Sequence, residues 1–139
     1  MDEGAPLRLI GPVYEYVPEG FYSVVYVKHS FDKAFKGSHK LRVVFRIVDE
    51  GPSHAVELFW FCNVKKGNKS YQARQSSKVA RQLRTLFGRD ALRGGLQVGR
   101  LKGMIFRART RTVGRDSTNS LLHENNHYSV IDELKEIIS

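Results

Sequence analysis

Hydrophobic and polar positions alternate along much of this chain, a pattern typical of half-buried β-strands. The clearest alternation covers residues 40–47, where one side is apolar and the other is mainly basic. The apolar side carries Leu41, Val43, Phe45 and Ile47, and the opposite side carries Lys40, Arg42, Val44 and Arg46. This strand is therefore expected to pack one face on a core and to turn a basic face outward.

Four further segments are predicted as strands because they are rich in β-branched and aromatic residues or continue the alternation. They cover residues 20–28, 56–63, 102–113 and 127–131. Turn residues at 49–53 indicate that strands 40–47 and 56–63 form a hairpin. Residues 31–39 are expected to form a polar loop that carries Phe31 and Phe35.

A helix is predicted after residue 76, where the period of apolar residues changes to three and four. Ser76 or Ser77 can cap its start, the apolar side chains are Val79, Leu83, Leu86 and Phe87, and Gly88 can end it. A second, short helix is expected over residues 133–138. In residues 1–19, the spacing of Pro6, Pro12 and Pro18 excludes a long helix, so we expect an arm held by Val13, Tyr14 and Tyr16.

This order of elements predicts a mainly β fold. Three strands, a helix and two strands match the five-stranded OB-type barrel, with one helix between the third and fourth strands and a short C-terminal helix. We expect residues 1–19 to be a Pro- and Gly-containing arm and residues 20–139 to be a single OB-like domain, with another five-stranded α+β sheet as the main alternative.

The net charge of the chain indicates which class of partner to expect. The 139 residues include 23 Lys and Arg against 14 Asp and Glu, a formal net charge of +9, which attracts polyanions. No apolar run is long enough to span a bilayer, so a membrane partner is not expected. The single cysteine, Cys62, excludes an intrachain disulfide and favours a reducing cytoplasm. Nucleic acid is the expected partner.

Four segments resemble a known family, the small OB-fold single-stranded DNA-binding proteins of bacteriophages and related mobile elements. They are Gly-Phe-Tyr-Ser-Val at 20–24, Leu-Arg-Val-Val-Phe-Arg-Ile-Val at 41–48, Phe-Trp-Phe-Cys-Asn at 59–63 and Val-Ala-Arg-Gln-Leu-Arg-Thr-Leu at 79–86. The resemblance implies protection of single strands during replication or recombination, without a cofactor. It implies no catalysed reaction.

Binding of single strands requires cations for the phosphates and flat side chains on which unpaired bases stack. The candidate stacking residues are Tyr22, Tyr26, Phe31, Phe35, Trp60 and Tyr71. Alternation allows either Trp60 or the pair Phe59 and Phe61 to face the binding groove, and the sequence leaves this open. The candidate phosphate contacts are Lys33, Lys36, Lys40, Arg42, Arg46, Lys65, Lys66, Lys69, Arg74, Arg107, Arg109 and Arg111.

Several alternatives stay open at this point. RNA is an alternative ligand, exposed strand edges would allow a homodimer, and Arg81, Arg84, Arg89 and Arg93 form either a second basic patch or a solvated face. The chain could instead be a basic adaptor that binds duplex nucleic acid or an acidic protein. His123, Glu124 and His127 match the spacing of a zinc-hydrolase motif, but two Asn residues inside the motif favour a turn over the helix it needs, so no metal is expected.

Overall fold

The computed structural model describes residues 4–34 and 37–139 of the chain. Its strands and helix are β1 (Phe21–Lys33), β2 (His39–Ile47), β3 (Glu57–Lys66), β4 (Tyr71–Gln72), α1 (Lys78–Phe87), β5 (Ile105–Val113) and β6 (Tyr128–Ile137). Short 3-10 helices cover Asp90–Leu92, Val98–Leu101 and Glu124–Asn126. Among the described residues, no helix has the length and apolar character needed to cross a membrane.

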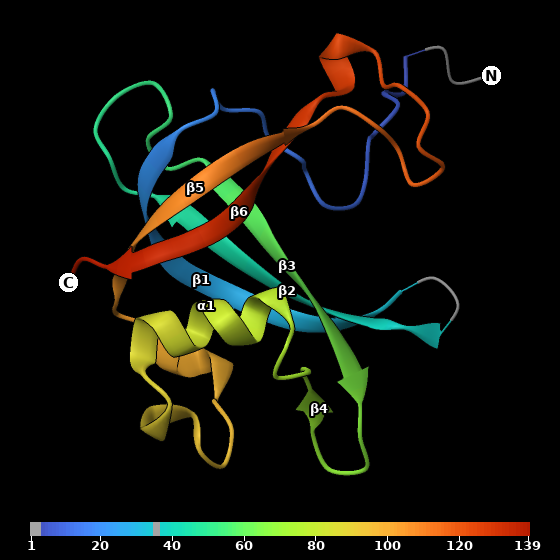
Figure 1. Ribbon diagram of the computed structural model, residues 1–139. Coiled ribbons are helices and arrows are strands. Elements are labelled where there is room, and N and C mark those ends of the chain that lie inside the picture. Colours follow the sequence, from blue (N-terminus) through green and yellow to red (C-terminus); the bar gives the residue numbers. More distant parts are fainter. Residues whose placement is uncertain (1–3, 35–36) are drawn as a thin grey trace.

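Five strands close into a mixed barrel (Figure 1). β1 pairs antiparallel with β2 and β5, β2 pairs antiparallel with β3, and β5 pairs antiparallel with β6. Closure comes from a parallel contact between β3 and β6 at one register position, Phe59 opposite Val130. The two-residue β4 extends the sheet beyond the end of β3. The prediction of a mainly β, five-stranded barrel is confirmed at this level.

The core lies inside the barrel and follows the predicted alternation. On β2, Leu41, Val43, Phe45 and Ile47 are buried, while Lys40 and Arg46 are exposed. On β3, the inward side chains are Leu58, Trp60 and Cys62. The predicted hairpin of β2 and β3 is confirmed, with Lys40 opposite Asn63 and Arg46 opposite Glu57.

The helix α1 begins and ends where its capping residues predict. The Ser77 side chain accepts a hydrogen bond from the Ala80 N–H at 3.2 Å, and Gly88, with φ of +82°, donates its N–H to the Arg84 carbonyl. Val79 is buried in the core, and Leu83 and Leu86 pack against it. We name residues 74–102 the helical module; its last 3-10 helix adds the buried Leu101 to the same core.

The predicted C-terminal helix over residues 133–138 is wrong, because β6 continues as a strand to Ile137. Its pairing with β5 skips Asp132 and Lys135, so each of these residues forms a β-bulge. Two bulges three residues apart bring Ile131, Leu134 and Ile137 to the same side of a strand. This spacing of three imitates the periodicity of a helix.

The first strand is longer than predicted, and the loop after it is shorter. β1 runs to Lys33 and β2 begins at His39, so Phe31 lies in a strand and not in a loop. Pairing between β1 and β2 continues as far as Lys33 opposite His39, across an irregularity between Tyr26 and Lys28. The polar residues in this segment suggested a loop, but its backbone groups pair with those of β2, so the segment is a strand.

Of the three residues predicted to hold the N-terminal arm, Tyr14 does so, and Val17 and Ser129 form further contacts that were not predicted. Val17 is buried, and Ser129 Oγ accepts its N–H and donates to its carbonyl, both at 2.9 Å. The Ser129 N–H also donates to the Glu15 carbonyl. Tyr14 contacts the barrel, whereas Val13 and Tyr16 are exposed. The arm therefore lies along the start of β6, beside the loop that joins β5 to β6 (Figure 1).

Candidate nucleic-acid interface

The outer face of β2 and β3 carries both basic and aromatic side chains. Because Leu58, Trp60 and Cys62 point into the core, Phe59 and Phe61 must point outward. Trp60 is only 3% exposed, which excludes it as a stacking residue in the folded protein. Phe59 and Phe61 are each half-buried. The sequence left open whether Trp60 or the pair Phe59 and Phe61 faces outward, and in the structure it is the pair.

Four rings form a continuous row from β3 to β6 across the arm. Phe61 lies 5.6 Å from Phe59, Phe59 lies 5.3 Å from Tyr14, and Tyr14 lies 4.8 Å from Tyr128, measured between ring centroids. None of the neighbouring rings in this aromatic row (Phe61, Phe59, Tyr14 and Tyr128) is parallel to the next, so each presents its own face or edge. Tyr14 is 47% exposed. The row is long enough to offer several separate contacts to planar groups.

Cations flank the aromatic row. Lys40 Nζ lies 5.9 Å from the centroid of Phe61, and Arg42 Cζ lies 5.3 Å from that of Phe59, so each cation can interact with the negative face of a ring. Arg42 also pairs with Asp32 at 3.1 Å. Burial raises the pKa of Tyr128, Tyr14 raises it further, and the charge of Arg111 opposes the shift. Lys40 and Arg42 therefore place positive charge beside Phe61 and Phe59, and Arg111, which is paired with Asp132, acts on Tyr128 from β5.

A groove opens next to Phe59, between the arm and the outer face of the barrel. Its volume is about 880 Å³. The arm contributes Pro12, Val13 and Glu15, β1 contributes Lys28 and Ser30, β2 contributes Arg42 and Val44, β3 contributes Glu57 and Phe59, and the loop after β2 contributes His54. Apolar and charged groups thus share the walls, as they must where bases and phosphates bind together.

The three arginines predicted on one face of β5 have different surroundings. Arg109 Nη2 binds Asp132 at 2.7 Å and Glu133 at 3.0 Å, and Arg111 Nε lies 3.3 Å from Asp132. Arg107 is exposed and lies over the ring of Phe21. Of the three, only Arg107 has no carboxylate partner within residues 4–34 and 37–139.

Asp132 is the centre of this ion-pair cluster, because it also binds Lys78 Nζ at 2.9 Å. Burial by itself would raise the pKa of Asp132, but hydrogen bonds from Lys78 and Arg109 lower it below its ordinary value. The same carboxylate raises the pKa of Arg109. Asp132 stays ionised at neutral pH and holds three cations at the edge of the β3–β6 contact.

Four predicted stacking residues, Tyr22, Tyr26, Phe31 and Tyr71, are half-buried and contact other residues of the protein. Tyr22, Tyr26 and Phe31 pack against the core. The Tyr22 hydroxyl donates to the Pro18 carbonyl at 2.6 Å, the Tyr26 hydroxyl lies 2.7 Å from His29 Nδ1, and Phe31 stacks on Tyr71 with centroids 4.1 Å apart. These rings do not join the aromatic row. Phe35 and Lys36 lie outside the described residues.

The remaining predicted cations surround the face without sharing one site. Arg46 pairs with Glu57 at 2.9 Å. The others are exposed along β1, around the β3–β4 hairpin or just before α1: Lys33, Lys65, Lys66, Lys69 and Arg74. They belong to the rim of the outer face, and their role in binding stays a prediction.

Three residues of the site were missed by the sequence analysis. Tyr14 was predicted only to hold the arm, Tyr128 only to start a strand, and Lys78 was not singled out. The sequence does contain one signal for Tyr128, since a period of two places it on the same face of the predicted strand as Val130. Nothing local indicates that the arm would carry Tyr14 to Phe59, because those residues are far apart in the chain.

The His123–His127 segment does not form the helix that a zinc-hydrolase motif requires. A 3-10 helix covers only Glu124–Asn126, and His123 and His127 flank it in non-helical conformations. His123 Nδ1 accepts the N–H of Asn125, and His127 Nε2 lies 3.2 Å from the Leu122 carbonyl oxygen. In residues 4–34 and 37–139, no three His, Cys, Asp or Glu side chains are grouped to hold a metal ion.

Comparison with protein-family models, with curated proteins and with solved structures found no match to this chain. The candidate interface therefore stands on the geometry of its own residues: a row of four rings, cations beside Phe59 and Phe61, and an adjoining groove.

Proposed function

We propose that this protein binds single-stranded DNA without sequence preference, through base stacking and phosphate contacts, and that it catalyses no reaction. The observation that carries the proposal is the partly exposed aromatic row with Lys40, Arg42 and Arg111 beside it. Unpaired bases offer two flat faces and one phosphate each, so a surface of rings and cations matches them chemically. A duplex keeps its bases stacked internally and cannot use the rings.

The order of the strands supports an OB-type barrel. β3 and β6 are parallel, the other pairs are antiparallel, and the helical module lies in the chain between the third strand and β5. OB barrels bind oligonucleotides on the face of their second and third strands and the adjoining loops. In this chain that face carries Arg42, Phe59 and Phe61. The proposal also fits the resemblance to the single-stranded DNA-binding proteins of bacteriophages and mobile elements.

Titration of a fluorescently labelled dT oligonucleotide, followed by anisotropy at two salt concentrations, tests the proposal. Wild-type protein should bind dT more tightly than a matched duplex, and the affinity should fall as salt rises because phosphate binding releases counterions. Each base stacked on a ring contributes about 1–3 kcal/mol. Phe59→Ala and Phe61→Ala should therefore weaken dT binding by between about fivefold and about 150-fold each.

The matched control is Phe21→Ala. Phe21 is a 50% exposed aromatic residue on β1 that also lies under an arginine, but it is outside the aromatic row. Its substitution should leave dT binding unchanged. Equal losses in all three variants would indicate a general effect of removing exposed rings, and no loss in Phe59→Ala or Phe61→Ala would refute stacking and leave the basic adaptor as the explanation. Replacing dT by rU compares DNA with RNA.

A further inference from the structure

The positive charge of the chain is concentrated in the helical module. Its 29 residues contain eight Lys and Arg residues and one acid, Asp90, which gives a net charge of +7. The other 110 residues contain fifteen basic and thirteen acidic residues, a net charge of only +2. The barrel itself is thus nearly balanced, and the helical module supplies most of the attraction for polyanions.

Most cations of the helical module are exposed and have no acidic partner among the described residues. This holds for Arg74, Arg81, Arg89, Arg100 and Lys102. Lys78 binds Asp132, Arg93 and Asp90 pair at 3.3 Å with both side chains more than 80% exposed, and Arg84 binds the uncharged Gln75. Arg84, Arg89 and Arg93 line one shallow hollow together with Gln75 and Leu92. Their charges are available to a ligand.

The helical module offers cations without aromatic partners. Phe87 is its only aromatic residue, and that side chain is half-buried and packs against the core. Such a surface can bind phosphates but has nothing on which an unpaired base could stack. This is the chemistry of a duplex contact, because a duplex presents phosphates to the protein and keeps its bases paired.

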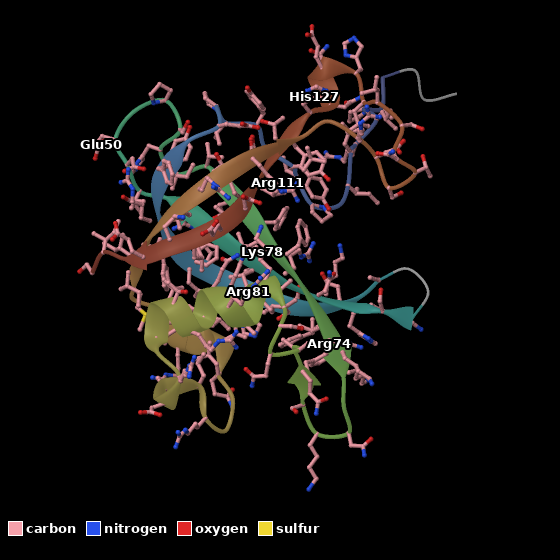
Figure 2. The ribbon with its side chains drawn as sticks, in the orientation of Figure 1. Glu50, Arg74, Lys78, Arg81, Arg111 and His127 are labelled. Carbon is pink, nitrogen blue, oxygen red and sulfur yellow. The ribbon has the colours of Figure 1, made fainter. Side chains whose placement is uncertain are left out.

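The two surfaces adjoin each other. A hollow of about 160 Å³ between β3, β6 and the start of α1 is lined by Phe61 from the aromatic row and by Lys78, Arg111 and Asp132. In the view of Figure 2, Arg111, Lys78 and Arg81 follow one another downward from the barrel to α1, and Arg74 lies lower still. Asp132 links the first two, since it binds both Lys78 and Arg111. A nucleic acid can thus pass from one surface to the other without leaving the protein.

We infer that the preferred ligand is a junction between single-stranded and duplex DNA. The single strand lies on the aromatic row, and the phosphates of the adjoining duplex contact the helical module. The inference rests on the proposed function, because the single-stranded part of the junction uses the same rings. It adds that the single strand is joined to a duplex, which the aromatic row alone does not indicate.

Three labelled ligands test the inference: a dT strand of roughly 15 nucleotides, near the upper site size of one OB barrel, a blunt hairpin duplex, and the same hairpin with the dT strand as its overhang. Wild-type protein should bind the overhang hairpin at least about tenfold more tightly than dT alone. In the double variant Arg81→Ala/Arg89→Ala, the affinity for the overhang hairpin should fall to the affinity for dT alone. The affinity for dT itself should change less than about twofold. The salt slope of this variant on the junction should fall by about 0.9 for each lost phosphate contact.

The control variant is Arg8→Ala/Lys135→Ala, which removes the same charge from exposed positions outside both surfaces. It should keep the preference for the junction. The inference is wrong if wild-type protein binds dT and the junction equally, or if Arg81→Ala/Arg89→Ala weakens both to the same extent, which would place the helical module on the path of the single strand. If wild-type protein binds the blunt hairpin but does not bind dT, the proposed function is refuted, and the inference of a junction ligand is refuted with it.

Discussion

Asp132 stabilises the barrel through ion pairs, and the same ion pairs neutralise cations that a ligand could otherwise contact. Its carboxylate holds Lys78, Arg109 and Arg111, three cations that a phosphate could otherwise contact. The residue is also a β-bulge of β6, and its side chain lies between Arg109 and Arg111 of β5 and Lys78 at the start of α1. One acidic residue therefore reduces the positive charge that is available to a ligand beside the β3–β6 contact.

Replacing this carboxylate should separate stability from binding. Asp132→Asn is expected to lower the free energy of unfolding by about 1 kcal/mol, because partly exposed ion pairs contribute little. It should raise the affinity for dT by about 1 kcal/mol, roughly fivefold, because one negative charge near the ligand is removed. Urea unfolding and anisotropy titration measure the two effects. Glu50→Gln is the control and should change neither, because Glu50 is an exposed turn carboxyl that lies away from Lys78 and Arg111, the partners of Asp132 (Figure 2).

The same residue gives the stability a dependence on pH. Its folded-state pKa lies below the ordinary value of 3.8, so its ion pairs stabilise the protein fully above about pH 4 and are lost as the pH falls through the lowered pKa. Wild-type protein should therefore lose stability below about pH 4 more steeply than Asp132→Asn does. Equal acid sensitivity of the two proteins would contradict the ion-pair cluster.

Individual residues of the site could be predicted where alternation decides them. The basic face of β2 and the outward position of Phe59 and Phe61 follow from a period of two, once Leu58 and Cys62 are known to be buried. The roles of Tyr22 and Phe31 could not be predicted in this way, because a ring at a strand position can face either side. Tyr14 joins the site only through the fold of the arm.

Among the elements, β6 is the one whose type was predicted wrongly at its C-terminal end. Apolar residues every three positions favour a helix in isolation, but pairing with β5 makes the segment a strand with two bulges. By contrast, α1 and the β2–β3 hairpin were predictable because their signals are local: Ser77 and Gly88 at the helix ends, and turn residues between the strands. The bulges depend on a partner strand that a local pattern does not contain.

The strand assignment of β6 makes Leu134 a core residue. Its side chain is 1% exposed and lies opposite Ala108 of β5. Leu134→Ala should lower the free energy of unfolding by about 2–5 kcal/mol, through lost burial and the cavity left behind. Ile138→Ala, at a 48% exposed position just after β6, should cost less than about 1 kcal/mol. Denaturant unfolding measures both, and similar costs would contradict the assignment.

At the scale of the whole molecule, the barrel protects its single thiol. Cys62 is buried on β3, and burial raises the pKa of the thiol to about 12. Since only the thiolate reacts, alkylation at neutral pH should require opening of the barrel. A dT ligand at about 100-fold above its Kd should stabilise the folded state by about 2.7 kcal/mol and slow alkylation roughly 100-fold, as mass spectrometry can follow. Equal rates in native and denaturing buffer would show that Cys62 is not protected.

The division of charge between the helical module and the barrel also sets how the molecule meets its ligand. A net charge of +7 on one part and +2 on the much larger remainder gives the protein a strong dipole moment. In the field of a polyanion this dipole orients the protein during diffusion, so the helical module faces the polyanion before any contact forms. Under the proposed function, we therefore expect encounters with DNA to begin with fast, non-specific capture by the module, and the adjoining aromatic row to bind unpaired bases afterwards.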